Sequence, residues 1–180
     1  MSPLKAIVVV LFAACCAAWA QPPRHPALEE AVRRTGLRVE PFTEPARASR
    51  EIRLRLQTGQ GPQAPVAAEL VQRSLRNAAP PRQRSAEISR DHLLILVLDR
   101  ERTVRYWQIV LDPRLVRGEF PDAAGNLRKT EFYRADAEVE VSVPDAVDAA
   151  EIRILAPSWP AGELLLTPVA SVALSGSGLQ

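Results

Sequence analysis

The sequence predicts an all-β protein whose antiparallel strands form two sheets packed face to face. Segments in which apolar and polar residues alternate recur at intervals of about 8–15 residues, as in two-layer β folds. The run 93–98 (LLILVL) is apolar at every position, which is typical of a strand buried on both faces. Strands and helices do not alternate along the chain, so nothing favours a parallel sheet. These observations together predict about seven strands.

The first twenty residues have the layout of a secretory signal peptide. Lys5 precedes the apolar run 6–18, and Ala18-Trp19-Ala20 provides small residues at a cleavage site. The apolar run is shorter than the roughly 20 residues that a membrane-spanning helix needs. We therefore expect residues 1–20 to be removed and the mature protein to be exported, to the periplasm or beyond.

The same segment also allows a lipid anchor. Phe12-Ala13-Ala14-Cys15 partly resembles a bacterial lipobox, in which the cysteine is lipidated and becomes the mature N-terminus. A lipid-anchored envelope protein is therefore the alternative to soluble export. Both cysteines of the chain, Cys15 and Cys16, fall inside the predicted signal. A fold held together by disulfides is excluded for the mature chain.

The remaining chain is predicted to form one domain with short extensions. Residues 21–49 form a Pro-rich arm with a short helix over 27–35, in which Leu28, Ala31 and Val32 share one face. Residues 50–174 form the β domain, and residues 175–180 (SGSGLQ) a flexible tail. The predicted strands are 51–57, 93–98, 103–111, 127–133, 137–143, 151–155 and 163–174, the last broken or bulged at Pro168.

Two parts of the β domain are harder to interpret. Residues 66–77 carry apolar side chains at helical spacing and predict a second helix, with two irregular strands under a long loop as the competitor. Residues 114–126 are predicted to be a long loop with a turn at 122–126. The number and spacing of strands resemble an immunoglobulin-like β-sandwich, although its Cys–Trp–Cys pattern is absent. A β-barrel or an α+β fold is the alternative.

Charge is divided along the chain. Residues 21–90 contain 13 arginines against 7 acidic residues, a net charge of +6, and residues 91–180 contain 9 basic against 14 acidic residues, a net charge of −5. The two halves can pair across one fold, or the basic half can contact an anionic surface. Nucleic acid is not an expected partner, because the arginines alternate with glutamates and no run of aromatic residues accompanies them.

Catalytic, cofactor and metal motifs are not found. His25 lies in the Pro-rich arm, and Asp91 and His92 are neighbours at the start of a strand, where adjacent side chains point to opposite faces. The serines lack a nucleophile-elbow context, and no Gly-rich phosphate loop is present. Glu138 and Glu140 share one strand face, which we interpret as solvated. We therefore expect neither an enzyme nor a bound cofactor or metal.

The aromatic residues are the candidate partner-binding residues. Tyr106 and Trp107 are neighbours in one strand, so one of them faces outward. The face that carries Trp107 is the more apolar, so we expect Trp107 in the core and Tyr106 exposed. Trp159, in a Pro-bounded turn, and Tyr133 are the other two candidates. The sequence thus predicts an exported, non-enzymatic interaction module that binds another extracytoplasmic protein.

Overall fold

The structure is a computed structural model that describes residues 26–58, 66–81 and 87–174. The predicted signal peptide and the predicted tail lie outside these ranges. The described chain is mostly strand, with one α-helix and one 3-10 turn. In chain order the elements are α2 (Pro26–Arg34), β1 (Arg38–Val39), β2 (Ser49–Thr58), β3 (Val66–Arg76), β4 (His92–Leu98), β5 (Thr103–Leu111), β6 (Leu115–Pro121), β7 (Leu127–Tyr133), β8 (Asp136–Pro144), β9 (Glu151–Ser158), η1 (Pro160–Gly162) and β10 (Leu165–Ala173).

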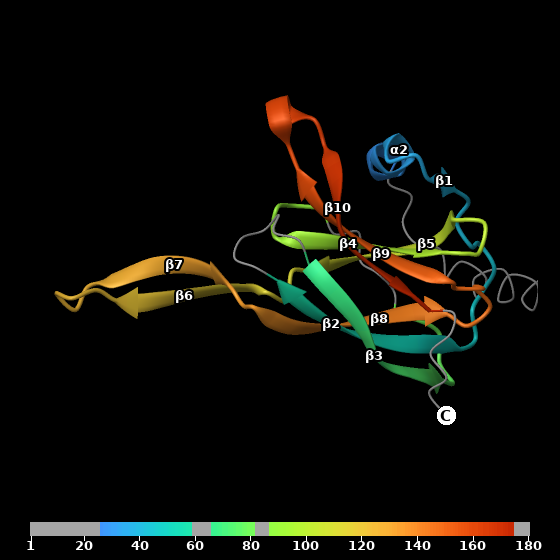
Figure 1. The fold of residues 1–180 in the computed structure, drawn as a ribbon, viewed down its shortest axis with the longest axis horizontal. Helices are drawn as coiled ribbons and strands as arrows, with labels where there is room; N and C mark the ends of the chain where they lie inside the picture. The colour runs from blue at the N-terminus through green and yellow to red at the C-terminus, as the bar shows by residue number, and fades with distance from the viewer. Residues whose placement is uncertain (1–25, 59–65, 82–86, 175–180) are drawn as a thin grey trace, which may run out of the picture.

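The strands form three sheets (Figure 1). A five-stranded sheet has the order β1-β5-β4-β9-β10, and a three-stranded sheet has the order β3-β2-β8. Strands β6 and β7 pair only with each other, and their hairpin extends away from the rest of the molecule. Strand β1 runs parallel to β5, whereas the other pairs among the described strands are antiparallel.

The main core lies between the five-stranded and three-stranded sheets. In β2 the alternation is clean, because Ile52, Leu54 and Leu56 are fully buried while the residues between them are not. The cluster contains Ile52, Leu54 and Leu56 of β2, Val139, Val141 and Val143 of β8, and Leu93, Ile95, Val97, Tyr106, Ile152 and Ile154 of the five-stranded sheet. Such burial of branched side chains is the main force that holds the two sheets together.

Helix α2 covers the other face of the five-stranded sheet. Its buried residues are the three predicted from the sequence, Leu28, Ala31 and Val32. They pack in one cluster with Leu94, Leu96, Leu98, Val104 and Trp107. Strand β4 therefore contributes alternate residues to two cores, which explains why 93–98 is apolar throughout and confirms its central position.

Most of the predicted strands are confirmed. The 93–98 and 103–111 segments form the expected antiparallel hairpin of β4 and β5. The pairing of β9 with β10 shifts register between Pro168 and Ala170, where a break or bulge was predicted. None of the helices within the described ranges has the length and apolar composition that a membrane crossing requires.

The predicted helix at 66–77 is wrong, because this segment is strand β3, paired with β2. Ala68 and Leu70 lie across from Leu56 and Leu54, toward the core. The register then shifts, so that Arg73 lies across from Ile52 and Val71 is the extra residue of a β-bulge. After the bulge, the odd-numbered residues Arg73 and Leu75 lie on the side of the strand that even-numbered residues occupy before it, but both are exposed. The resulting spacing of apolar residues imitates a helical stripe.

The predicted loop at 114–126 is also wrong in part, since residues 115–121 form β6. The turn at its end is confirmed: the Gly125 N–H donates to the Asp122 carbonyl at 2.9 Å, and Gly125 has φ of 83°, which glycine adopts without strain. A hairpin outside the core buries little apolar surface. Its first strand therefore leaves a weak periodic signal in the sequence.

Candidate functional site

A cleft lies where the five-stranded sheet divides. Strands β4 and β9 pair from Leu98 and Glu151 only as far as Leu94 and Leu155. Beyond that point β9 continues beside β10 to Ser158, away from the start of β4. The cleft between them has a volume of about 670 Å³, and the base of the β6–β7 hairpin forms its third side. This volume is within the usual range for small-molecule sites.

A buried ion pair lies at the base of the hairpin. Arg114 is fully buried, and its Nε and Nη2 donate to Oδ1 and Oδ2 of Asp112 at 2.8 and 2.7 Å. The guanidinium of Arg114 also lies 5.8 Å from the centre of the Tyr133 ring. These contacts hold the start of β6 against the end of β7. They also fix the position of the Tyr133 side chain, which lines the cleft.

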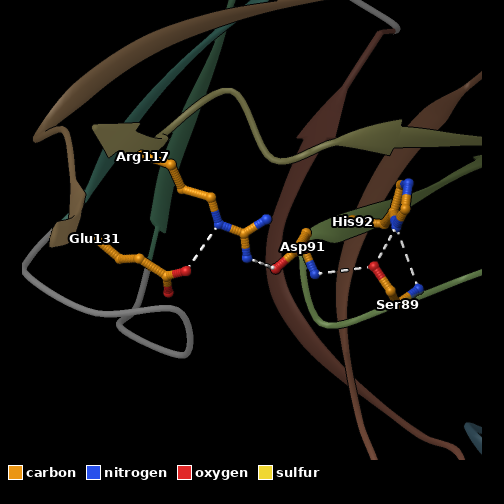
Figure 2. Close-up of polar contacts among 5 residues, drawn as sticks. All are labelled: Ser89, Asp91, His92, Arg117 and Glu131. Carbon is orange, nitrogen blue, oxygen red and sulfur yellow. Dashed lines mark hydrogen bonds and ion pairs between the residues drawn. The ribbon is translucent and has the colours of Figure 1, made fainter. Parts of the chain in front are cut away.

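Arg117 joins the hairpin to the body of the molecule (Figure 2). Its Nη2 donates to Oδ1 of Asp91 at 2.6 Å, and its Nε donates to Oε1 of Glu131 at 2.8 Å. The hydrogen bonds to Asp91 and then to Glu131 raise the pKa of Arg117 above its ordinary value. The arrangement is an exposed three-membered network along the cleft, made of residues from β6, β7 and the segment before β4.

Ser89 and His92 form a local turn on the other side of Asp91 (Figure 2). The backbone N–H of His92 donates to the Ser89 carbonyl at 3.1 Å, which closes a β-turn. The backbone N–H and the Oγ of Ser89 lie 3.2 and 2.7 Å from His92 Nδ1. A backbone N–H can only donate, so Nδ1 accepts and the ring proton lies on Nε2. These contacts support the turn, and Asp91 contacts Arg117 instead of His92.

The structure brings together two of the three predicted contact residues. Tyr133 and Trp159 are both half-buried and both line the cleft, Trp159 from the turn that precedes η1. Within the described ranges, no group of three or more His, Cys, Asp or Glu side chains is arranged to hold a metal ion. The side chains that line the cleft can form hydrogen bonds, ion pairs and contacts with aromatic rings.

The prediction that Tyr106 faces outward is wrong. Tyr106 is only 7% exposed and lies in the core between the sheets, and its burial raises its pKa to about 12. Trp107 is 3% exposed on the helix side, which confirms its predicted place in a core. A two-sided sheet has no outer face at this position, because α2 covers one side and the three-stranded sheet the other. Tyr106 is consequently no candidate for contact with a partner.

The hairpin carries a second candidate surface, which we call the hairpin face. Cross-strand pairs place Val116, Gly118 and Phe120 of β6 beside Phe132, Thr130 and Arg128 of β7. Phe120 and Phe132 are 46% and 44% exposed, and their ring centres are 6.2 Å apart. A side chain at Gly118 would come within 2.7 Å of the Phe120 ring, so glycine lets this ring lie flat along the strand. The opposite side is charged, with Arg117, Glu119, Lys129 and Glu131.

Sequence reasoning missed the residues that the hairpin contributes, above all Arg117, Phe120 and Phe132. Strand β6, which carries Arg117 and Phe120, was interpreted as a loop, whereas Phe132 lies in the predicted strand 127–133 but was not selected as a contact residue. The signal that could have found β6 is the alternation of charged and uncharged residues in 116–120 (VRGEF), directly before the 122–126 turn. Glu138 and Glu140 do lie on the outer face of β8, where they contact Arg55 and Arg53 in exposed ion pairs. That face carries solvent-exposed side chains of opposite charge.

Comparison of the chain with protein-family models, with curated proteins and with solved structures gave no match. The functional argument therefore depends on the geometry of the cleft and of the hairpin face.

Proposed function

We propose that this chain is an exported, non-enzymatic interaction module that binds another extracytoplasmic protein through the hairpin face. One observation carries the proposal: an isolated two-stranded sheet presents neighbouring, half-exposed phenylalanine rings on a single side. Two-stranded hairpins are marginally stable in water unless another surface packs against them. Exposed aromatic residues grouped in this way are typical of protein-binding surfaces.

The charge distribution of the hairpin supports the same reading. All four glutamate, arginine and lysine side chains of its central pairs, Arg117, Glu119, Lys129 and Glu131, lie on the side opposite the phenylalanines. Only Arg128 is charged on the hairpin face, and its Nε contacts Oδ2 of Asp122 at 2.9 Å. Depletion of charge at the centre of a patch, with charge at its border, is the usual composition of an interface.

The body of the molecule holds the hairpin in place. The Asp112–Arg114 pair fixes its base, and Arg117 joins it to Asp91. A rigid support lowers the ordering cost when a partner binds. We propose that the body itself is a β-sandwich of immunoglobulin-like architecture, which is supported by the apolar core between its two sheets.

Site-specific photo-crosslinking tests this proposal. A photoreactive residue at Thr130 lies on the hairpin face, and the same residue at Glu119 lies on the charged side. In envelope extract we expect one dominant crosslinked protein from position 130 and none from position 119. Phe132→Ser should remove the product, whereas Leu75→Ser, a substitution at a 69% exposed leucine of β3, should not. Equal crosslinking from both sides, or a product insensitive to Phe132→Ser, would contradict the proposal.

The alternative is a lipid-anchored envelope protein with a structural or assembly role, with Cys15 as its lipidated first residue. Mass spectrometry of the mature protein distinguishes the two. A chain that begins at Gln21 supports soluble export, and a chain that begins at Cys15 with an added acyl mass supports the anchor. The hairpin face would serve either form.

A further inference from the structure

We propose that the cleft between β4, β9 and the hairpin base binds a neutral oligosaccharide. This ligand is distinct from the protein partner of the hairpin face, because the cleft residues Tyr133, Arg117 and Glu131 lie on the other side of the hairpin from Phe120 and Phe132. The inference therefore goes beyond the proposed function and is tested separately.

The first argument is the balance of charge. Arg90, Asp91, Asp112, Arg117 and Glu131 line the cleft, and Arg114 lies directly behind Asp112 and Tyr133. Three cations thus stand against three carboxylates. A ligand with a large net charge would gain little attraction here. A neutral ligand that is rich in hydroxyl groups can use both signs, since a hydroxyl donates to carboxylates and accepts from guanidinium groups.

The second argument is the set of hydrogen-bonding atoms that the local contacts leave available. Within the described ranges, Arg117 contacts Oδ1 of Asp91 and Oε1 of Glu131, so the second oxygen of each carboxylate can accept from a ligand. The turn at Ser89 places the ring proton of His92 on Nε2, where it can donate. The cleft therefore offers acceptors and a donor that are already positioned by other contacts, a condition for selective recognition of a polar ligand.

The third argument is the pair of aromatic rings. Trp159 and Tyr133 line the same cleft from different elements, and Tyr133 is held against the Arg114 guanidinium. Sugar rings have apolar C–H faces and polar edges, so they pack against aromatic side chains while their hydroxyls reach polar groups at the border. A volume of about 670 Å³ admits a short chain of such rings.

An extended peptide fits the cleft less well. A peptide strand added to the last residues of β9 would meet Pro157, which has no N–H to donate. Pro160 follows at the border of the cleft. A peptide bound by side chains alone becomes one of the outcomes of the test.

The test measures binding of a small panel to the mature protein by isothermal titration calorimetry, with tryptophan fluorescence as a second readout. The neutral probes are chitotriose, cellotriose and maltotriose, and the comparison probes are trigalacturonate and a proline-rich peptide. The chain has three tryptophans, of which Trp19 lies in the predicted signal and Trp107 is buried, so a fluorescence change reports on Trp159. We expect at least one neutral probe to bind at micromolar to millimolar concentration.

Matched variants connect any binding to the cleft. Trp159→Ala should weaken binding of the neutral probe by about tenfold or more, whereas Leu75→Ala, at a 69% exposed leucine of β3 that does not line the cleft, should leave the affinity unchanged. If Trp159→Ala does not fold, Glu131→Gln at an exposed position serves in its place. The inference is overturned if no neutral probe binds, if trigalacturonate or the peptide binds more tightly, or if the cleft variant has no effect. The crosslinking at Thr130 tests the hairpin face, so its result does not depend on whether a probe binds in the cleft.

Discussion

Asp112 and Arg114 form an ion pair that is almost completely withdrawn from water. Both Nε and Nη2 of the guanidinium contact the carboxylate, and the backbone N–H of Arg114 donates to the same Oδ1 at 3.0 Å. The two residues are 7% and 0% exposed. A charge at such a site is stable only with its partner, because its desolvation is otherwise uncompensated.

The first prediction follows from this pair. Arg114→Met leaves a buried carboxylate without its partner, and we expect it to lower the free energy of unfolding by about 3–5 kcal/mol in a chemical denaturation experiment. The double variant Arg114→Met/Asp112→Leu should recover a large part of that loss, because it removes both charges. Arg128→Met, which breaks the exposed pair with Asp122, is the control and should unfold near the parental midpoint. A double variant no more stable than Arg114→Met would show that the pair is not the cause.

The second prediction concerns the central strand. Leu96 is fully buried against α2, so Leu96→Asp places an unpaired charge in a core and should abolish folding. Leu111, at the end of the neighbouring strand, is 69% exposed, and Leu111→Asp should melt as the parent does. Circular dichroism melts of the two variants check this. A folded Leu96→Asp protein would be incompatible with the position of β4.

The third prediction is a loss of stability in alkali. Burial raises the pKa of Tyr106 to about 12, so the unfolded chain loses its phenolic proton first, near pH 10. The neutral phenol stabilises the folded state fully below pH 10. This stabilisation is lost as the pH rises toward the pKa of Tyr106 in the folded protein. By linkage the free energy of unfolding should fall by about 2–3 kcal/mol across this window. The pKa of Tyr133 is also raised, chiefly by burial.

Tyr106→Phe provides the control for the alkaline prediction, since it keeps the ring and removes the titrating group. Denaturation at several pH values should show a clearly shallower decline for this variant than for the parent. The same slope in both proteins would mean that Tyr106 does not titrate as its burial requires.

The fourth prediction concerns the tip of the hairpin. Oδ1 of Asp122 accepts from the backbone N–H groups of Ala124 and Asn126, and these bonds, that of Asn126 first, lower the pKa of Asp122. Because the pKa of Asp122 is lower in the folded protein, its carboxylate stabilises the turn at pH values above the unfolded pKa near 4. This stabilisation is lost as the pH falls below that value. Asp122→Ala should therefore give faster amide hydrogen exchange in β6 and β7 but not in β4. Unchanged protection of the hairpin would refute this role.

The sequence predicted those parts of the fold in which the order of apolar and polar residues follows the buried faces. The period of two in 51–57 and 137–143, the apolar run 93–98 and the three apolar residues of the first helix each report directly which face is buried. Tyr133 and Trp159, which the sequence named as candidate contact residues, both line the cleft. In β3 the bulge at Val71 interrupts the alternation, and β6 lies in a hairpin outside the core. For these two strands the residue pattern therefore does not report which face is buried.

The sequence by itself determined the β-rich class, the central strand, the first helix with its apolar face and the hairpin of β4 and β5. Only the tertiary structure decided which sides of the sheets are open. Tyr106 is buried because a helix and a second sheet cover both faces of β5, and the cleft exists because β9 leaves β4 at Leu155. Local periodicity reports alternation within one strand, whereas the coverage of a face depends on segments that are distant in the chain.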